Sequence, residues 1–368
     1  MNSQNPIVDA HLDLAYNATR GRDVTKPARE QPQVGAEIAT VGLPDLVAGN
    51  VRLVCATIFC EPASSDSKTG YRTADEAHEQ AMEQLAWYRQ QFDFGTMRCV
   101  RTRDDQVLAR DPAVSAVQAA QTVGKSESPY QAGSQDGRNA PVTVDAALLL
   151  EGGDPLRNPD DVQKLFDLGV RMVGLAWKRT RLAGGTGDPG PLSADGIAII
   201  NELDRVGIIH DASHLAEHSF WQLLDRAAGP IIASHSNCRA IVGGPGNRHL
   251  TDDMIRALVE RGGVIGINFF DRFLLPRHEQ GKRRATLADV VAHAKHICDL
   301  AGDANHVGLG TDMDGGLGRD QIPQEITTSA DLPRVGEALG AGGFGDEDVR
   351  KILGGNWLSF LGRSLPAA

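Results

Sequence analysis

The sequence predicts a (β/α)₈ barrel of the TIM type. Short apolar runs alternate with segments of helical periodicity along most of the 368 residues, which is typical of parallel α/β folds. The runs are nearly continuous, as expected of parallel strands that are buried on both faces. Acidic and imidazole residues follow several runs, and such barrels place their functional residues at the C-terminal ends of the strands.

Eight apolar runs are candidate strands, and this number favours a closed barrel. They are residues 7–12, 51–59, 145–150, 170–175, 207–212, 230–234, 263–268 and 306–310. Apolar residues at helical spacing predict most of the segments between them. These are residues 73–92, 159–168, 193–206, 216–227, 252–261, 287–301 and 346–354. Thr73 with Glu76, and Ser193 before its helix, have the residue types of helix N-terminal caps.

Two stretches, about 61–72 and 122–143, are rich in serine, glycine and proline and predict loop insertions. No repeat or linker divides the chain, so we expect a single domain over residues 1–368. The net charge of −11 disfavours nucleic acid or an anionic membrane as a partner.

The five cysteines form no CxxC pair, which favours a reducing compartment. The first residues lack the basic and apolar segments of a secretory signal. No apolar run approaches the roughly 20 residues that span a bilayer. We therefore expect a soluble cytoplasmic protein.

His11 and Asp13 end the first candidate strand with one residue between them. Alternate residues of a strand point to the same side, so both side chains can enter one site. Imidazole nitrogen and carboxylate oxygen are suitable zinc ligands. The alternative is a hydrogen-bonded pair at a strand end, and this motif alone favours that alternative.

Glu151 ends an apolar run and precedes Gly152 and Gly153. A carboxylate in this place is costly unless it is paired or bound to metal. One carboxylate can bridge two metal ions with an oxygen on each. The alternative is a salt bridge to Arg171 or Lys178.

His214 and His235 each follow a strand that contains Ile-Ile. Two histidines on successive strands favour a metal site over packed core histidines. His210 has the strand parity of His214 and is a candidate barrel-lining residue. Candidate hydrogen-bond partners that would fix the ring tautomers are Asp211, Ser213, Ser234 and Ser236.

Asp312 and Asp314 lie in GLGTDMDGG, after the last candidate strand. A carboxylate beside a metal-bound water is a natural general base and later acid. Asp312 is nearer the strand end and is the better candidate, although either aspartate could instead orient the loop through its backbone amides.

Arg248 lies in the segment GGPGNRHLTDD. It is a candidate clamp for an anion, because a guanidinium binds a carboxylate through two parallel hydrogen bonds. The alternative is a surface arginine that caps the acidic start of the next helix.

These motifs, in this order, resemble the membrane (renal) dipeptidase family, zinc peptidases of family M19 in the amidohydrolase-like group of barrels. The match runs from His11 to about Leu361. The matching segments are DAHLDL, LLLEGG, IIHDASH, IIASHS, GNRHLTDD, GLGTDMDG and ILGGNWL. The resemblance implies two zinc ions per chain: His11 and Asp13 would hold one, and His214 and His235 the other. Glu151 and a hydroxide or water would bridge them.

The resemblance also implies the remaining roles. The hydroxide would attack the scissile carbonyl, Asp312 would pass a proton to the departing amine, and Arg248 would hold the substrate's terminal carboxylate. Family members often accept a D-residue at the C-terminal position, and a homodimer is the assembly that the resemblance implies.

Trp177 departs from the family pattern, because the animal members have a histidine there that steadies the developing oxyanion. An indole is bulkier and has a single N–H donor. Losing an oxyanion donor costs about 3–4 kcal/mol if nothing replaces it. Candidate replacements are Lys178, Arg179 and Arg181. We assign Trp177 to substrate binding.

We therefore expect a two-zinc dipeptidase that hydrolyses small dipeptide-like substrates with a free C-terminal carboxylate. One alternative is a two-metal hydrolase of a lactone or a non-peptide amide, which Trp177 keeps open. Another is a metal-binding homologue without catalysis. Asp312 and Arg248 argue against the second alternative, because a structural metal site needs neither.

Overall fold

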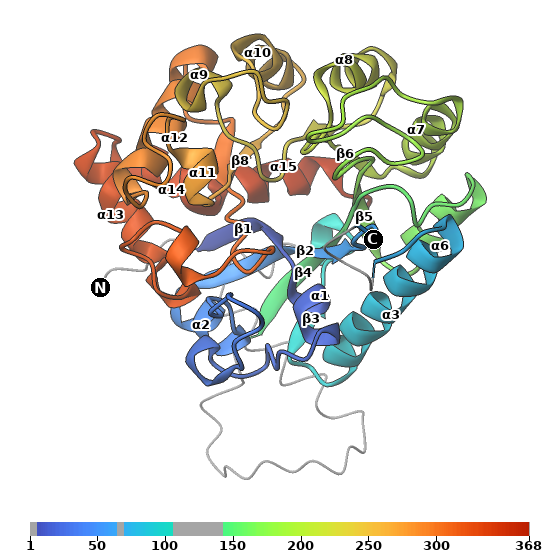
Figure 1. Ribbon diagram of the computed structural model, residues 1–368, viewed down its shortest axis with the longest axis horizontal. Helices are drawn as coiled ribbons and strands as arrows, with labels where there is room; N and C mark the ends of the chain where they lie inside the picture. Colours follow the sequence, from blue (N-terminus) through green and yellow to red (C-terminus); the bar gives the residue numbers. More distant parts are fainter. Residues whose placement is uncertain (1–5, 65–69, 106–142, 368) are drawn as a thin grey trace.

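The computed structural model describes residues 6–64, 70–105 and 143–367. Strands occupy the centre and helices surround them (Figure 1). The strands are β1 Ile7–Leu12, β2 Val51–Phe59, β3 Met97–Cys99, β4 Val144–Glu151, β5 Val170–Gly174, β6 Ile209–Asp211, β7 Ile231–Ile232, β8 Ile265–Ile267 and β9 Val307–Leu309.

The helices follow the strands along the chain and vary widely in length. The α-helices are α1 Leu14–Thr19, α2 Leu43–Ala48, α3 Ala74–Asp93, α6 Asp160–Asp167, α7 Ala194–Val206, α8 Glu217–Arg226, α9 Arg239–Val242, α10 Asp252–Glu260, α11 Asp271–Leu274, α12 Leu287–Ala301, α13 Pro333–Ala341, α14 Asp346–Arg350 and α15 Asn356–Ser364. Short turns of other helix types are η1 Ala28–Glu30, η3 Arg319–Gln321, η4 Ser329–Asp331 and the π-helical η5 Lys351–Gly355.

The strands close into the predicted barrel. Paired strands are parallel and follow the order β7-β6-β5-β4-β2-β1-β9-β8. A parallel bridge between Ala233 and Ile265 joins the two ends of this order. Ala233 N donates to Val264 O at 3.1 Å and Gly266 N donates to Ala233 O at 2.8 Å. The carboxyl ends of eight strands therefore meet around one mouth.

The sequence did not predict β3. It pairs with the N-terminal half of β4, where Met97 lies opposite Val144, on the edge that β5 occupies farther along. Three residues are too few to give a clear period-2 pattern. The candidate strand at 207–212 also begins too early, because Gly207 ends α7 in the left-handed region with φ +85°.

The seven predicted helices are present with ends within about two residues, except that the last is divided between α14 and η5. Thr73 Oγ1 accepts the N–H of Glu76 at 3.2 Å, and Ser193 Oγ accepts that of Gly196 at 3.0 Å. The short helices such as α9 and α11 escaped prediction because one turn carries no periodic pattern.

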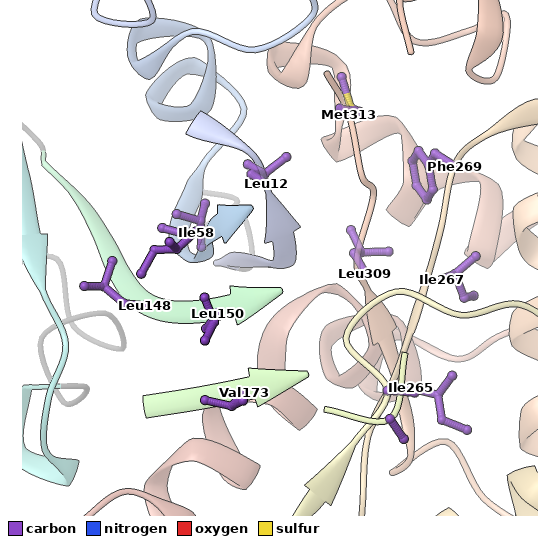
Figure 2. Close-up of a cluster of buried hydrophobic side chains, with 14 of the residues drawn as sticks. Leu12, Ile58, Leu148, Leu150, Val173, Ile265, Ile267, Phe269, Leu309 and Met313 are labelled. Atoms are coloured by element: carbon purple, nitrogen blue, oxygen red, sulfur yellow. The ribbon is translucent and has the colours of Figure 1, made fainter. Parts of the chain in front are cut away.

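The pleat of the strands divides the core into two layers. Outward residues such as Leu148 and Leu150 pack beneath the helices, and Figure 2 shows a part of this outer layer. Inward residues such as Ala147 and Leu149 fill the barrel together with Trp357 from α15. The barrel interior is therefore packed below the mouth, and only residues at the strand ends can form a site.

Of the two predicted insertions, residues 122–142 lie outside the described residues. In the other, Ala63 N donates to Tyr71 O and Tyr71 N donates to Glu61 O, so the described ends of this loop pair with each other. No helix in the described parts of the chain is long and apolar enough to span a membrane.

Gly308 tests the packing of the barrel interior. A Cβ at this position would lie 2.3 Å from Trp357 Nε1, so Gly308→Ala is expected to lower the free energy of unfolding by about 1–3 kcal/mol. Gly340 in α13 has no heavy atom within 4 Å of such a Cβ. Gly340→Ala is expected to raise the free energy of unfolding by up to about 1 kcal/mol. Urea unfolding of both variants checks the prediction, and equal effects would contradict it.

Candidate metal centre

Six predicted site residues converge at the C-terminal mouth of the barrel. Their ligand atoms form two groups, and within each group the atoms lie within 4.8 Å of one another. One group is Glu151, His214 and His235, and the other is His11, Asp13 and Asp312. All six residues are buried, and the Asp312 side chain is the most exposed of them. The sequence separations between them show that the fold, and not any local motif, assembles this cluster.

Glu151 lies between the two groups. It continues the inward parity of Ala147 and Leu149 along β4, so the pleat directs its carboxylate into the barrel. Its Oε1 is 3.2 Å from His214 Nε2 and 3.4 Å from His235 Nε2. Its Oε2 is 3.4 Å from Nε2 of His11. Each oxygen of the carboxylate thus faces a different set of imidazoles.

The alternative salt bridge from Glu151 to Arg171 or Lys178 is wrong. Arg171 donates to the carbonyl oxygens of Arg101 and Phe166, and its guanidinium lies over the Phe166 ring. Lys178 is exposed, with its Nζ 5.0 Å from the centre of the Trp177 ring.

A register shift in β1 brings His11 and Asp13 to the mouth. The pairing of β1 with β2 is irregular between Asp9 and Leu12, and such irregularities re-aim side chains. Leu12 accordingly points to the outer core layer, while His11 faces Glu151. The Thr57 hydroxyl on β2 donates to Asp13 Oδ1. His11 and Asp13 therefore contact other strands, and the simple strand-end pair is not what forms.

Backbone strain is concentrated at this mouth. Among the described residues, four non-glycine residues have positive φ, and three of them are His214 (+66°), Asp312 (+59°) and Asp314 (+64°). Left-handed backbone costs a non-glycine residue of order 1–3 kcal/mol and persists where the surroundings hold it. The left-handed backbone directs these three side chains differently from the side chains of a regular strand.

Hydroxyl groups hold His214 and His235. Thr186 Oγ1 is 2.9 Å from His214 Nδ1, and Ser234 Oγ is 2.8 Å from His235 Nδ1. The predicted partner Asp211 accepts from Ser234 Oγ at 2.5 Å and so supports His235 indirectly. With Nδ1 engaged, each ring presents Nε2 to Glu151.

His210 does not line the barrel, contrary to its expected parity. It points outward, and its Nε2 lies 2.7 Å from Asp204 Oδ1 on α7. The left-handed turn at His214 breaks the alternation that linked the two residues.

The residues fit divalent cations. His214 Nε2 and His235 Nε2 are only 2.8 Å apart, and His11 Nε2 is buried without a hydrogen-bond partner among the described residues. At this distance the two nitrogens either share a proton or, when both are unprotonated, repel each other unless a cation lies beside them. Three imidazoles and three carboxylates are a donor set suited to zinc and to related divalent ions.

The carboxylates respond to burial and to their neighbours. Burial raises the pKa of Asp13 to about 6 and that of Asp312 to about 7; Glu151 adds to both shifts and His11 opposes them. Burial alone would also raise the pKa of Glu151, but His11 and His214 hold it well below its usual range. Glu151 is therefore the anion of the site, and it favours positive charge next to it.

The histidines divide into two kinds. Burial lowers the pKa of His214 to about 4 and that of His235 well below its usual value, and Arg248 adds to both shifts. These rings are neutral, which is the form that binds metal. Burial would lower the pKa of His11 too, but Glu151 raises it to about 10. The position between His11 and Glu151 thus favours a positive charge.

Asp312 and Asp314 have different surroundings. Asn268 Nδ2 donates to Asp312 Oδ2 at 2.8 Å, and Asp312 Oδ1 is 3.9 Å from His11 Nε2. Asp314 instead accepts from the backbone N–H groups of Thr40 and Val41 at 2.9 and 3.0 Å. Asp314 orients the loop, and Asp312 is the aspartate that faces the cluster.

Arg248 is buried beside the cluster. Its Nη2 donates to His235 O at 2.6 Å and its Nη1 to Ser236 Oγ at 3.2 Å, while its Nε has no partner among the described residues. The surface-cap alternative is wrong, because Thr251 caps α10 by accepting from Met254 N at 3.2 Å. A buried guanidinium with a free donor suits an anionic ligand.

Trp177 is half-buried at the same mouth. Its ring centre is 6.4 Å from that of His214 and 5.2 Å from that of Phe59. Two of its candidate replacements are engaged elsewhere: Arg179 pairs with Asp188 at 2.8 Å and Arg181 with Asp195 at 2.6 Å.

Sequence reasoning missed several supports of the cluster. Asn268 follows the run GVIGI directly, so the strand-end signal was present for it. Thr57 lies on the same inward side of its strand as Leu53 and Cys55. Knowledge of the register between β1 and β2 would have shown that it reaches Asp13. Asp9 gave no signal. It lies within β1 and accepts from Thr311 N at 2.8 Å, which joins β1 to the segment that carries Asp312.

A family model described as Membrane dipeptidase (Peptidase family M19) matches residues 1–364. Over 212 residues the chain is 34% identical to an uncharacterized protein in the pqqA 5′ region of Klebsiella pneumoniae, covering 55% of this chain and 74% of that protein. It is 32% identical over 220 residues to dipeptidase tcpJ of Claviceps purpurea, covering 57% of this chain. That alignment spans 49%, about half, of the Claviceps protein.

Solved structures agree with the family match. A dipeptidase described as a metallopeptidase of family M19 is 26% identical, with a TM-score of 0.74, and the match covers 99% of this chain and 100% of that one. A metallopeptidase of Rhodobacter sphaeroides, liganded with a phosphinate mimic of the dipeptide L-Ala-D-Ala, is 24% identical, with a TM-score of 0.75 and coverage of 98% and 100%. The second likeness shows the shared fold.

Metal removal and return test the cluster. The chelator-treated protein is expected to bind two Zn²⁺ per chain, measured by isothermal titration calorimetry and elemental analysis. Glu151→Gln removes the negative charge and one acceptor oxygen between the two groups, so both binding steps are expected to weaken by at least about tenfold. Glu202→Gln on α7, which loses an exposed pair with Arg205, is the control. Unchanged binding of two ions by the Glu151 variant would contradict the bridging role.

Proposed function

The chain belongs to the membrane dipeptidase family, peptidase family M19, and we propose that it is a two-zinc dipeptidase. Its substrates would be small dipeptide-like molecules with a free C-terminal carboxylate. The observation that carries the proposal is the position of Glu151, whose two oxygens face separate sets of imidazoles. A single structural metal site has no use for that arrangement.

Five residues would hold the two ions. His11 and Asp13 belong to one, His214 and His235 to the other, and Glu151 to both. Divalent cations in such a site polarise a carbonyl and acidify water, which supplies the hydrolytic nucleophile at neutral pH. The chain itself orients the ligands. The hydroxyl groups of Thr57, Thr186 and Ser234 make hydrogen bonds that hold, in the same order, Asp13, His214 and His235.

Asp312 is positioned to move a proton. Asn268 fixes its Oδ2, which leaves Oδ1 toward His11 and the cluster. A Cβ at residue 315 would collide with Oδ1, so Gly315 keeps that side of the carboxylate open. Asp312 would accept a proton from the attacking water and return it to the departing amine.

Arg248 would bind the substrate's carboxylate. Two of its donors are spent on His235 O and Ser236 Oγ, and these bonds fix the guanidinium while Nε remains available. The Phe273 ring beneath it, with its centre 5.1 Å from Cζ, keeps water from that face. Such an anchor holds the scissile bond at a set distance from the cluster.

Trp177 and Phe59 would form the apolar side of the substrate pocket, since their rings pack edge to face next to His214. The indole in place of the family histidine also favours a second candidate, a two-metal hydrolase of a lactone or a non-peptide amide. Tolerance of a C-terminal D-residue is part of the proposal and rests on the family. The cytoplasmic location and the homodimer stay predictions.

Asp312→Asn tests the proton transfer. Because the amide cannot accept and return a proton, kcat for a dipeptide is expected to fall by about 10²–10⁴-fold while two zinc ions stay bound. Steady-state hydrolysis of L,L-, L,D- and N-acyl dipeptides and of lactones, with metal analysis of each preparation, checks it. Asp320→Asn, an exposed carboxylate on η3, is the control. A parental rate in the Asp312 variant would remove this residue from the mechanism.

Arg248→Gln tests the carboxylate anchor. A charged hydrogen bond contributes about 1.5–3 kcal/mol, so kcat/KM for a dipeptide is expected to drop by roughly 10- to 150-fold. The corresponding dipeptide amide lacks the carboxylate, and its kcat/KM should barely respond to the substitution. Arg256→Gln on the exposed face of α10 serves as the control. Equal losses on acid and amide would show that Arg248 acts otherwise.

A further inference from the structure

We propose that Ser234 is a positioning residue that sets both metal subsites at once, because its hydroxyl holds one histidine of each. The first subsite is His11 with Asp13, and the second is His214 with His235. This inference rests on the proposed function, since it concerns the same ions. It adds that the two subsites share one hydrogen-bond partner and therefore respond together to its loss.

The contacts of the Ser234 hydroxyl carry the inference. Its Oγ is 2.8 Å from His235 Nδ1 and 3.3 Å from His11 Nδ1. It is also 2.5 Å from Asp211 Oδ2. The residue is fully buried, so water does not compete for these bonds. The rings of His11 and His235 lie against each other, with centres 3.6 Å apart, which lets one hydroxyl reach both.

Counting protons gives the direction of the bonds to Asp211, His11 and His235. A serine hydroxyl donates once and accepts twice. Asp211 can only accept, so it takes the single Ser234 proton, and its Oδ1 is held by the backbone N–H groups of Ser213 and Ser234 at 3.0 and 2.9 Å. The lone pairs of Ser234 Oγ then accept Nδ1–H from both His11 and His235, and the Ser213 hydroxyl is a further neighbour of this oxygen at 3.3 Å. Both rings are thereby held with Nε2 toward Glu151.

The side chains of His11, Asp211 and His235 have the composition of a third cation site. The Ser234 hydroxyl lies among them and makes a hydrogen bond to each. These three side chains therefore form a hydrogen-bonded cluster around Ser234. The two nitrogens of His11 differ accordingly. Its Nδ1 has a hydrogen-bond partner, whereas its Nε2 has none among the described residues.

The backbone of Ser234 lies close to two other strands. A Cβ on Gly266 or Gly310 would lie 1.9 or 1.8 Å from the carbonyl oxygen of Ser234. Glycine at both positions lets the backbone of residue 234 pass close to β8 and β9.

Thr186 provides a matched comparison within the same site. Its Oγ1 lies 2.9 Å from His214 Nδ1 and touches no ring of the first subsite. Ser329 provides a control of another kind, because it is a buried serine on η4 whose hydroxyl has no hydrogen-bond partner in the described structure.

The test is zinc titration of the chelator-treated full-length protein by calorimetry, for the parent and for Ser234→Ala, Thr186→Val and Ser329→Ala. Loss of such a partner costs about 10–100-fold in metal affinity. Ser234→Ala is expected to weaken both binding steps by this factor, Thr186→Val only one step, and Ser329→Ala neither. Two unchanged steps, or one changed step, in Ser234→Ala would overturn the inference. A parent that binds fewer than two ions would overturn the proposed function instead.

A second measurement needs no variant and covers the case in which Ser234→Ala does not fold. Long-range ¹H–¹⁵N correlation spectra of the zinc-treated parent at pH 8 report which nitrogen of each histidine carries the proton. His11 and His235 are expected to carry it on Nδ1. A proton on Nε2 of either ring would overturn the inference, whatever the number of ions bound.

Discussion

The buried carboxylate of Glu151 is the constraint on which the mouth of the barrel depends. An ionised carboxylate in an apolar interior is very costly unless positive charge or hydrogen-bond donors surround it. Here three imidazole nitrogens lie within 3.4 Å of its oxygens, and they come from segments after β6 and β7 and from β1. The barrel brings these segments together. The negative charge of Glu151 then makes the space between their imidazoles favourable for cations.

The site is assembled by departures from regular structure. The register shift in β1 turns His11 inward, and left-handed residues turn His214 and Asp312 at the ends of their strands. Regular strands supply the rigid support, and their packed inner layer confines the departures to the mouth. This division is expected where strain is stored at a functional site and offset by the rest of the fold.

Most of the barrel could be predicted because its strands are apolar runs and its helices are periodic. The cluster could be predicted because its members follow those runs, as His235 follows PIIAS. What failed depended on register or on turns. His210 was assigned to the wrong side because the sequence does not reveal the left-handed turn at His214. β3 was missed because three residues carry no pattern. Tertiary hydrogen bonds, such as Thr57 to Asp13, have no local signature at all.

Two glycine-rich loops at the mouth, one with Gly185 and Gly187 and the other with Asn247, are joined by hydrogen bonds. Asn247 precedes Arg248, and its side chain accepts from Gly187 N at 2.9 Å and donates to Gly185 O at 2.7 Å. Thr186, between these glycines, lies against His214 Nδ1, and its N–H donates to the carbonyl of Trp177. A displacement of the Arg248 loop therefore reaches a histidine of the cluster through two hydrogen bonds. Both bonds between the loops come from the Asn247 side chain, and the last contact comes from the Thr186 hydroxyl, so the link depends on these two side chains.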